Sequence, residues 1–186
     1  MANLKMLIYD VILAAYVIIA LSIFVPWVLL SLAPHDRTFL AICDFIGWFY
    51  SNLCHQLPFR TLYYDGIKMP VCARDVSIYI ATALGLIFFR LKGFGTKEFK
   101  MNYVLLVLLF IPTALDGFTQ LFGFRESTNL LRLIAGFLFG VSYAYIIVWA
   151  LPLIYVLLEL IITAVKKDGD TDSVLGRIKK MVWPFG

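Results

Sequence analysis

The sequence predicts an all-α membrane protein, a polytopic bundle of about four transmembrane helices with one re-entrant or interfacial helix. Composition is one basis for this prediction: 62% of the 186 residues are hydrophobic and 15% are charged, whereas soluble domains carry about 25% charged residues. The other basis is that the apolar residues form runs of about 20 residues, the length that crosses a bilayer as a helix. A chain of this length is expected to form one transmembrane domain, residues 1–186.

Four apolar runs are predicted to cross the membrane: residues 6–32, 71–89, 101–115 with a continuation to 122, and 130–165. The first run is too long for a signal-peptide core and has no small-residue cleavage pattern, so we expect it to be retained. The last run would measure about 54 Å as one helix. We therefore expect Pro152 to kink it and the segment around Glu159 to emerge among the headgroups.

Two further segments are predicted to lie at the membrane surface. Residues 39–53 are apolar but too short and too polar to span, so we expect a re-entrant or interfacial helix that delivers Cys54 and His55 to the surface. Residues 166–186 form a basic cytoplasmic tail, in which basic and apolar residues alternate as they do in an interfacial helix. Cys43 is expected to be a small buried hydrophobe.

The basic residues predict the orientation, because cytoplasmic loops carry an excess of Lys and Arg. With a cytoplasmic N-terminus, ten basic residues are on the inner side: Lys5, Arg90, Lys92, Lys97, Lys100, Lys166, Lys167, Arg177, Lys179 and Lys180. Six are on the outer side: Arg37, Arg60, Lys68, Arg74, Arg125 and Arg132. A multi-pass protein of the cell membrane with both termini cytoplasmic is therefore predicted. The outer cations are mostly Arg, which pairs bidentately with carboxylate or phosphate, so we expect a built site on the extracytoplasmic face.

Polar residues that helix packing does not require gather on this outer side, where ionisable groups beside hydrocarbon usually mark a functional site. They are Cys54, His55, Gln56 and Arg60; Cys72, Arg74 and Asp75; Asp116 and Gln120; and Arg125, Asn129 and Arg132. Spacings of three or four residues put three pairs on shared helix faces: Cys72 with Asp75, Asp116 with Gln120, and Asn129 with Arg132. Gly136 and Gly140 continue the last face and are expected to allow close helix approach.

These motifs resemble those of a family of small, uncharacterised prokaryotic membrane proteins of unknown function. The family has a Cys-His-Gln-x-Pro-x-Arg-Ser/Thr tract, a Pro-x-Cys-x-Arg tract ending in Cys or Asp, and a later Asp-Gly-x-x-Gln segment. They match residues 54–61, 70–75 and 116–120 here, and the resemblance extends to about residue 140. Many bacterial members have Cys where this chain has Asp75, an exchange that keeps a residue able to bind metal. The resemblance implies no established activity.

One interpretation of the polar residues is a metal site, because they combine the N, S and O ligands that zinc accepts. The candidate ligands are His55, Cys54, Cys72 and Asp75. Asp116 would then be a general base or a fourth ligand, with His55 as the other catalytic candidate. A second interpretation is a disulfide between Cys54 and Cys72 on the oxidising side, which would keep both thiols from binding metal.

The arginines also allow two interpretations. In one, they belong to a structural network in which, for example, Arg74 pairs with Asp75 or Asp116. In the other, they clamp an anionic group and the polar amides orient it. The residues of this predicted ligand site are Arg60, Arg74, Arg125 and Arg132, with Gln56, Gln120 and Asn129.

The leading hypothesis from the sequence is a metal-dependent membrane enzyme, with zinc, acting on the phosphate or ester of a lipid or isoprenoid headgroup. The alternatives are a non-enzymatic transporter or binding protein for an anion or a metal ion, and a thiol-disulfide membrane protein. The expected partners are membrane lipids and an anionic lipid or phosphate-bearing ligand. The net charge of +4 does not indicate nucleic-acid binding, because the basic residues lie at the ends of the predicted spans, where topology accounts for them.

Overall fold

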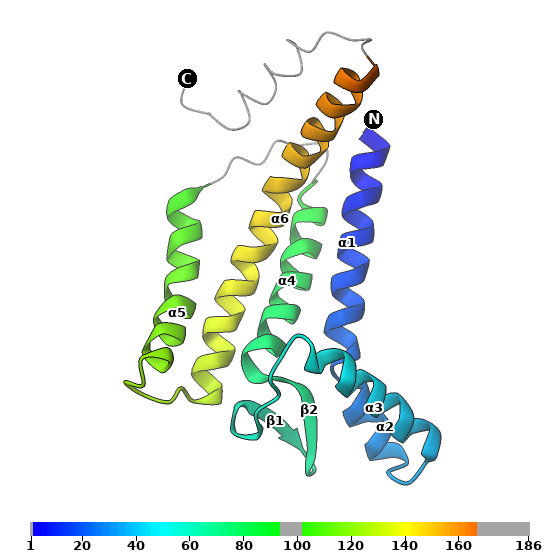
Figure 1. Cartoon of the computed structure of the whole chain (residues 1–186), viewed down its shortest axis with the longest axis vertical. Helices are drawn as coiled ribbons and strands as arrows, with labels where there is room; N and C mark the ends of the chain where they lie inside the picture. The colour runs from blue at the N-terminus through cyan, green and yellow to red at the C-terminus, as the bar shows by residue number, and fades with distance from the viewer. Residues whose placement is uncertain (1, 94–101, 167–186) are drawn as a thin grey trace.

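The protein is a helical bundle with a small β-hairpin at one end, so the predicted all-α membrane class is confirmed (Figure 1). The computed structural model describes residues 2–93 and 102–166. Its elements are α1 (Ala2–Ser22), α2 (Val25–Leu32), α3 (Arg37–Ser51), a 3-10 turn (Pro58–Arg60), β1 (Thr61–Tyr64), β2 (Ile67–Cys72), α4 (Ala73–Leu91), α5 (Tyr103–Leu121) and α6 (Asn129–Lys166). Helices α1, α4, α5 and α6 run lengthwise, while α2, α3 and the hairpin gather at what we call the hairpin end.

Within residues 2–93 and 102–166, three segments are long and apolar enough to cross a membrane: Met6–Leu32, Tyr103–Leu121 and Asn129–Leu157. They correspond to three of the four predicted spans. The other, residues 71–89, corresponds to α4, which packs against α1 and α6. Helix α4 carries three charged residues, Arg74, Asp75 and Arg90, and it begins later than predicted because residues 71 and 72 belong to β2.

The first predicted span is two helices rather than one. Helix α1 ends at Ser22 and α2 begins at Val25, with Pro26 in its first turn. Proline is tolerated there because the first amides of a helix have no partner within the helix. Figure 1 shows α2 turning away from the axis of α1 to lie beside α3.

Helix α3 occupies the region predicted to be re-entrant or interfacial. Its first turn is capped by the Asp36 carboxylate, which accepts hydrogen bonds from the amides of Thr38 (2.8 Å) and Phe39 (3.0 Å). Cys43 on this helix is half-buried rather than fully buried. The helix ends at Ser51, three residues before Cys54.

The β-hairpin was not predicted, although the sequence contains its turn signal. Asp65 and Gly66 have φ values of +48° and +77°, and Asp-Gly is a strongly favoured pair for two-residue hairpin turns. Strands β1 and β2 pair antiparallel, with Thr61 opposite Cys72. The indole Nε1 of Trp27 donates a 3.0 Å hydrogen bond to the carbonyl of Ile67, which ties the hairpin to α2.

Helix α6 is a single helix of 38 residues that continues through Pro152. Its glycines allow α4 to approach closely, as predicted. A Cβ at Gly140 would lie 2.6 Å from the Ile78 carbonyl oxygen. The side chain of Glu159 and the predicted interfacial helix in the tail beyond Lys166 lie outside the described residues, as do several of the inner cations.

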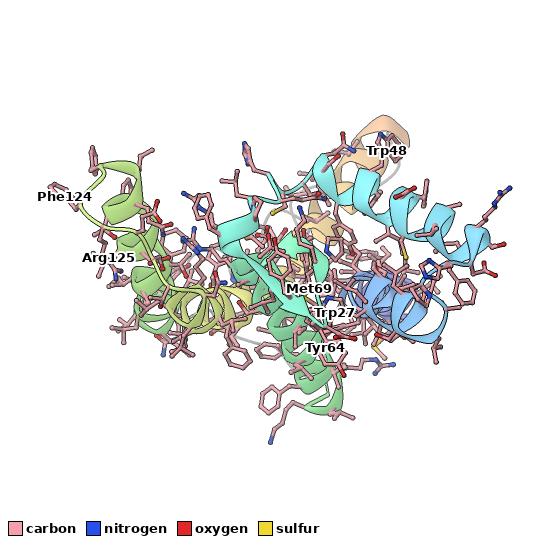
Figure 2. All side chains as sticks on the ribbon, turned by 90° about the horizontal axis from the view of Figure 1, so that it is seen from below. Trp27, Trp48, Tyr64, Met69, Phe124 and Arg125 are labelled. Atoms are coloured by element: carbon pink, nitrogen blue, oxygen red, sulfur yellow. The ribbon has the colours of Figure 1, made fainter. Side chains whose placement is uncertain are left out.

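Two apolar clusters hold the bundle together. The cluster at the hairpin end contains Ile23, Tyr50, Cys54, Met69, Val71 and Val76, so it joins the turn between α1 and α2 to α3, β2 and α4. The cluster at the opposite end contains Tyr9, Leu86, Ala144 and Val148. Seen from the hairpin end, Trp27 and Met69 lie near the centre, while Trp48 lies on the outer side of α3 (Figure 2).

Candidate functional site

The first polar group at the hairpin end consists of Cys54, Cys72 and Asp75, and we call it the thiol group. Cys54 follows α3, where its amide donates to the Tyr50 carbonyl (2.8 Å). Cys72 ends β2 and is the N-cap residue of α4, and Asp75 lies in the first turn of that helix. The hairpin therefore brings two cysteines that are 18 residues apart to the same place.

The three side chains of the thiol group contact one another. The Cys72 thiol donates to Asp75 Oδ2 (3.1 Å), and the Cys72 amide donates to Cys54 Sγ (3.2 Å). The hydrogen bond from Cys72 lowers the pKa of Cys54, against the effect of burial. The pKa of Cys72 is raised, first by its bond to Cys54 and then by burial and the charge of Asp75. Both cysteines are free thiols here.

The thiol group has a donor set that suits zinc. The two Sγ atoms and a carboxylate oxygen all lie within 4.8 Å of one another. Zinc bound at about 2.3 Å to sulfur and about 2.0 Å to oxygen needs ligands about 3.5 to 3.8 Å apart, so a small contraction would complete the set. His55 is exposed and does not belong to this group.

The second polar group surrounds Asp116 on α5, which is 3% exposed. Its carboxylate forms an ion pair with Arg74 from α4, a second one with Arg125 (3.2 Å), and accepts a 2.9 Å hydrogen bond from Gln120. Figure 2 shows Arg125 at the α5 side of the hairpin end. Asp116 is therefore the ionic partner of two arginines and lies outside the thiol group. The sequence had suggested that it would be a fourth metal ligand or a general base.

Arg132 near the start of α6 is the most deeply buried arginine in the described part of the chain, at 2% exposed. Its hydrogen-bond partners among the described residues are neutral oxygens: Asn129 Oδ1 (3.0 Å), Gln120 Oε1 (3.3 Å) and the Phe59 carbonyl (3.5 Å). Its guanidinium is repelled by those of Arg60 and Arg74 and attracted by Asp116. A buried cation with this surplus of positive neighbours is expensive unless an anion joins it.

Arg60 and Arg74 have unused hydrogen-bonding capacity. The Nε atoms of both are buried and have no hydrogen-bond partner among the described residues. The guanidinium of Arg60 lies over the Phe59 ring, 5.1 Å from its centroid. We call Arg60, Arg74, Arg125 and Arg132 the arginine cluster. Arg74 and Arg125 form ion pairs with Asp116, and Arg60 and Arg74 lie near Arg132.

Two of the predicted ligand residues, Gln56 and Asn129, use their side-chain amides to bind backbone carbonyls of the protein. The Gln56 amide donates to the Gly47 carbonyl of α3 (2.8 Å), and its backbone has a φ of +50°. The Asn129 amide donates to the Thr61 carbonyl (3.4 Å), while its oxygen accepts from Arg132. The start of α6 is thus hydrogen-bonded to the backbone carbonyls of Phe59 and Thr61, which lie in the 3-10 turn and at the start of β1. The Asp-Gly turn signal was the one feature of the sequence that could have indicated a hairpin here.

Comparisons with known proteins identify the family of this chain. Residues 54–146, which contain both polar groups, match the family model described as "Predicted membrane protein (DUF2085)". An uncharacterised protein of Methanocaldococcus jannaschii, MJ1492, is 37% identical over 142 residues, covering 75% of this chain and 89% of the relative. An uncharacterised protein of Methanothermobacter thermautotrophicus is 42% identical over 94 residues, covering 50% of this chain and 81% of the relative. No solved structure matches. The chain therefore belongs to the DUF2085 family of membrane proteins, and the predicted membership of a family of uncharacterised membrane proteins is confirmed.

Proposed function

We infer that this protein binds a phosphate-bearing headgroup with its arginine cluster at the extracytoplasmic face of the membrane. The observation that carries the proposal is the burial of Arg132 among neutral oxygens with Arg60 and Arg74 nearby. Phosphate is the natural occupant of such a cluster, because its oxygens accept several guanidinium hydrogen bonds at once. The unused Nε atoms of Arg60 and Arg74 offer two further donors.

In its enzymatic form, the proposal adds a zinc ion held by Cys54, Cys72 and Asp75. Three protein ligands leave one position for water or substrate, the arrangement of catalytic rather than structural zinc, and zinc there would supply Lewis-acid chemistry. Asp75 and Arg74 are consecutive in the first turn of α4, which puts the metal ligands next to the arginine cluster. With Asp116 engaged by arginines, exposed His55 is the better candidate for proton transfer.

The topology proposed with this function is the sequence-based one, with α4 as a fourth span and both termini in the cytoplasm. Its support is the position of Arg90 at the far end of α4. There Arg90 Nε forms an ion pair with Asp10 of α1 (2.7 Å). The charges of α4 therefore lie at its two ends, where they can reach the headgroup regions, with an apolar segment between them.

A second candidate function is thiol–disulfide exchange by Cys54 and Cys72. The observation that favours it is the approach of the two Sγ atoms to within 4.8 Å. Oxidation of both thiols to a disulfide would reduce a partner disulfide to two thiols. This candidate needs no arginine cluster, so tests on the arginines and on the thiols separate the two functions.

Thermal unfolding of the purified protein in detergent tests phosphate binding. Pyrophosphate should raise the Tm in a saturable way, by the equivalent of about 2.7 kcal/mol at 100 times its Kd. Arg132→Gln should abolish this rise and leave the Tm without anion unchanged or slightly higher, because one repelled cation is removed. Arg90→Gln, at the other end of the same bundle, is the matched control and should keep the full rise.

Sodium chloride at the same ionic strength distinguishes binding from general screening. A rise of the Tm with chloride alone, or an equal loss of the pyrophosphate effect in both arginine variants, would overturn the proposal.

A further inference from the structure

We propose that the groove between α4 and α6 holds the hydrocarbon chain of an anionic lipid whose phosphate lies at the arginine cluster. This inference rests on the proposed function and specifies its ligand: an amphiphile with one chain in the groove, rather than a free phosphate. The argument depends on the size of the groove, its lining and its position relative to Arg74 and Arg132.

The groove is a cavity of about 350 Å³ whose lining is almost entirely apolar. Val76 and Ile80 of α4 form one wall, and Leu133, Ile134 and Phe137 of α6 form the other. This volume lies near the lower end of the range for small-molecule sites, which is about 300 to 1,000 Å³. It therefore suits a single extended chain better than a bulky ring system or two chains together.

Both walls of the groove begin in the helical turns that carry the arginines. On α6, Leu133 directly follows Arg132. On α4, Ser77 lines the groove, and its hydroxyl donates to the Arg74 carbonyl (2.8 Å). The helical turns that carry Arg74 and Arg132 thus adjoin one end of a groove whose lining is apolar. This arrangement is complementary to an anionic head with an apolar tail.

The position of the groove within the bundle also explains why a lipid would enter from the bilayer. Ile134 and Phe137 are half exposed on the outer surface of α6, within the membrane-crossing segment Asn129–Leu157. Because a chain in the bilayer is already out of water, entry gains packing rather than hydrophobic transfer. Selectivity must then come from the headgroup, since a neutral lipid leaves Arg132 without a counter-ion.

Photolabelling in nanodiscs of phosphatidylcholine tests the inference. The probe is a lysophosphatidic acid with a diazirine in its single chain, compared with a monoacylglycerol that has the same chain and no phosphate. The phosphate-bearing probe should label residues 76–80 and 133–138. Excess unlabelled lysophosphatidic acid should suppress this labelling, and excess monoacylglycerol should not.

A pair of matched variants tests the position of the chain. Ile134→Trp fills the groove and should reduce its labelling about fivefold, while pyrophosphate still raises the Tm. Ile154→Trp is the control, because Ile154 is on the same helix and similarly exposed (50% against 52% for Ile134) but does not line the groove. The competition result in the unmodified protein decides the matter even if a variant folds poorly.

The outcomes separate this inference from the proposed function. Equal labelling by both probes, or labelling that phosphate-bearing competitor does not suppress, would mean ordinary boundary lipid and would overturn the inference. If pyrophosphate still raised the Tm in that case, the phosphate site would stand without a lipid chain. If pyrophosphate and lysophosphatidic acid both had no effect, the proposed function would fail as well.

Discussion

Asp116 on α5 and Arg74 at the start of α4 form an ion pair that links two helices, although α5 otherwise packs mainly along α6. The carboxylate is nearly completely buried, and Arg125 contacts it from the following loop. Asp116 thus forms ion pairs with two of the four arginines of the cluster, Arg74 and Arg125. Its removal has consequences for both stability and anion binding.

Asp116→Asn should destabilise the protein by about 2 kcal/mol, because Arg74, which is partly buried, and Arg125 both lose the buried carboxylate that pairs with them. The Tm in detergent should fall, and pyrophosphate should restore part of the loss by supplying the missing negative charge. Asp65→Asn at the hairpin tip is the control, since Asp65 is exposed and Asn also tolerates a positive φ. Equal Tm values for the two variants would contradict the role given to Asp116.

Gly136→Ala should destabilise the crossing of α4 and α6 by about 2 kcal/mol through overpacking. The added Cβ would lie 2.2 Å from Ser77 Oγ and 2.5 Å from the Arg74 carbonyl oxygen. The hydroxyl can rotate away, but the carbonyl belongs to the helix backbone. Because the same crossing sets the positions of Arg74 and Arg132, the pyrophosphate effect on the Tm should also weaken.

Gly117→Ala is the matched control for that substitution. Gly117 lies within α5, and a Cβ there would meet nothing within 4 Å. Alanine should be neutral or stabilising by up to about 1 kcal/mol, since it has the higher helix propensity. A loss of stability in both variants would indicate that the helices tolerate no larger residue in general, and it would not support close packing at Gly136 in particular.

The parts of the site that were predictable from sequence are those set by helix geometry. Asp116 with Gln120 and Asn129 with Arg132 share helix faces, as their spacing predicts, and each pair is hydrogen-bonded. Cys72 ends β2 and caps α4 instead of lying within a helix, but its thiol still reaches Asp75. Such pairs depend on a 3.6-residue period that holds in any helix, whatever its neighbours. The close approach at the α6 glycines was predictable for a similar reason, because a missing side chain is visible in the sequence.

The parts that were not predictable depend on loops and on packing between helices. The convergence of Arg74, Asp116 and Arg132 requires three helices in a particular rotation, which spacing within one helix cannot specify. The separation of His55 from Cys54 depends on the loop after α3, where Gln56 takes a positive φ. The hairpin that brings Cys72 to Cys54 differs from the predicted span at residues 71–89, because Val71 and Cys72 extend an apolar run in sequence but end strand β2 in the structure.

Labelling of single cysteines should establish the topology. In a background in which the three native cysteines are replaced by alanine, Asp65→Cys places a thiol at the exposed hairpin tip and Lys92→Cys places one at the opposite end of α4. A membrane-impermeant maleimide added to intact cells should label the first variant, and the second only after permeabilisation, because the inner side is expected to hold more basic residues. The reverse pattern would move both polar groups to the cytoplasmic face.

Metal analysis should decide between the uses of the thiol group. Protein purified without a metal-affinity tag is expected to hold about one zinc per chain, and Cys72→Ser should remove it. His55→Ala should retain zinc, because His55 lies outside the three residues whose ligand atoms approach one another. This result would distinguish the three ligands of the structure from the larger set that the sequence suggested.

Loss of zinc in His55→Ala would instead show that the histidine is a metal ligand. Zinc-free protein in which Cys54 and Cys72 are bridged, measured as a mass two hydrogens lower without reductant, would remove the metal and favour thiol–disulfide exchange.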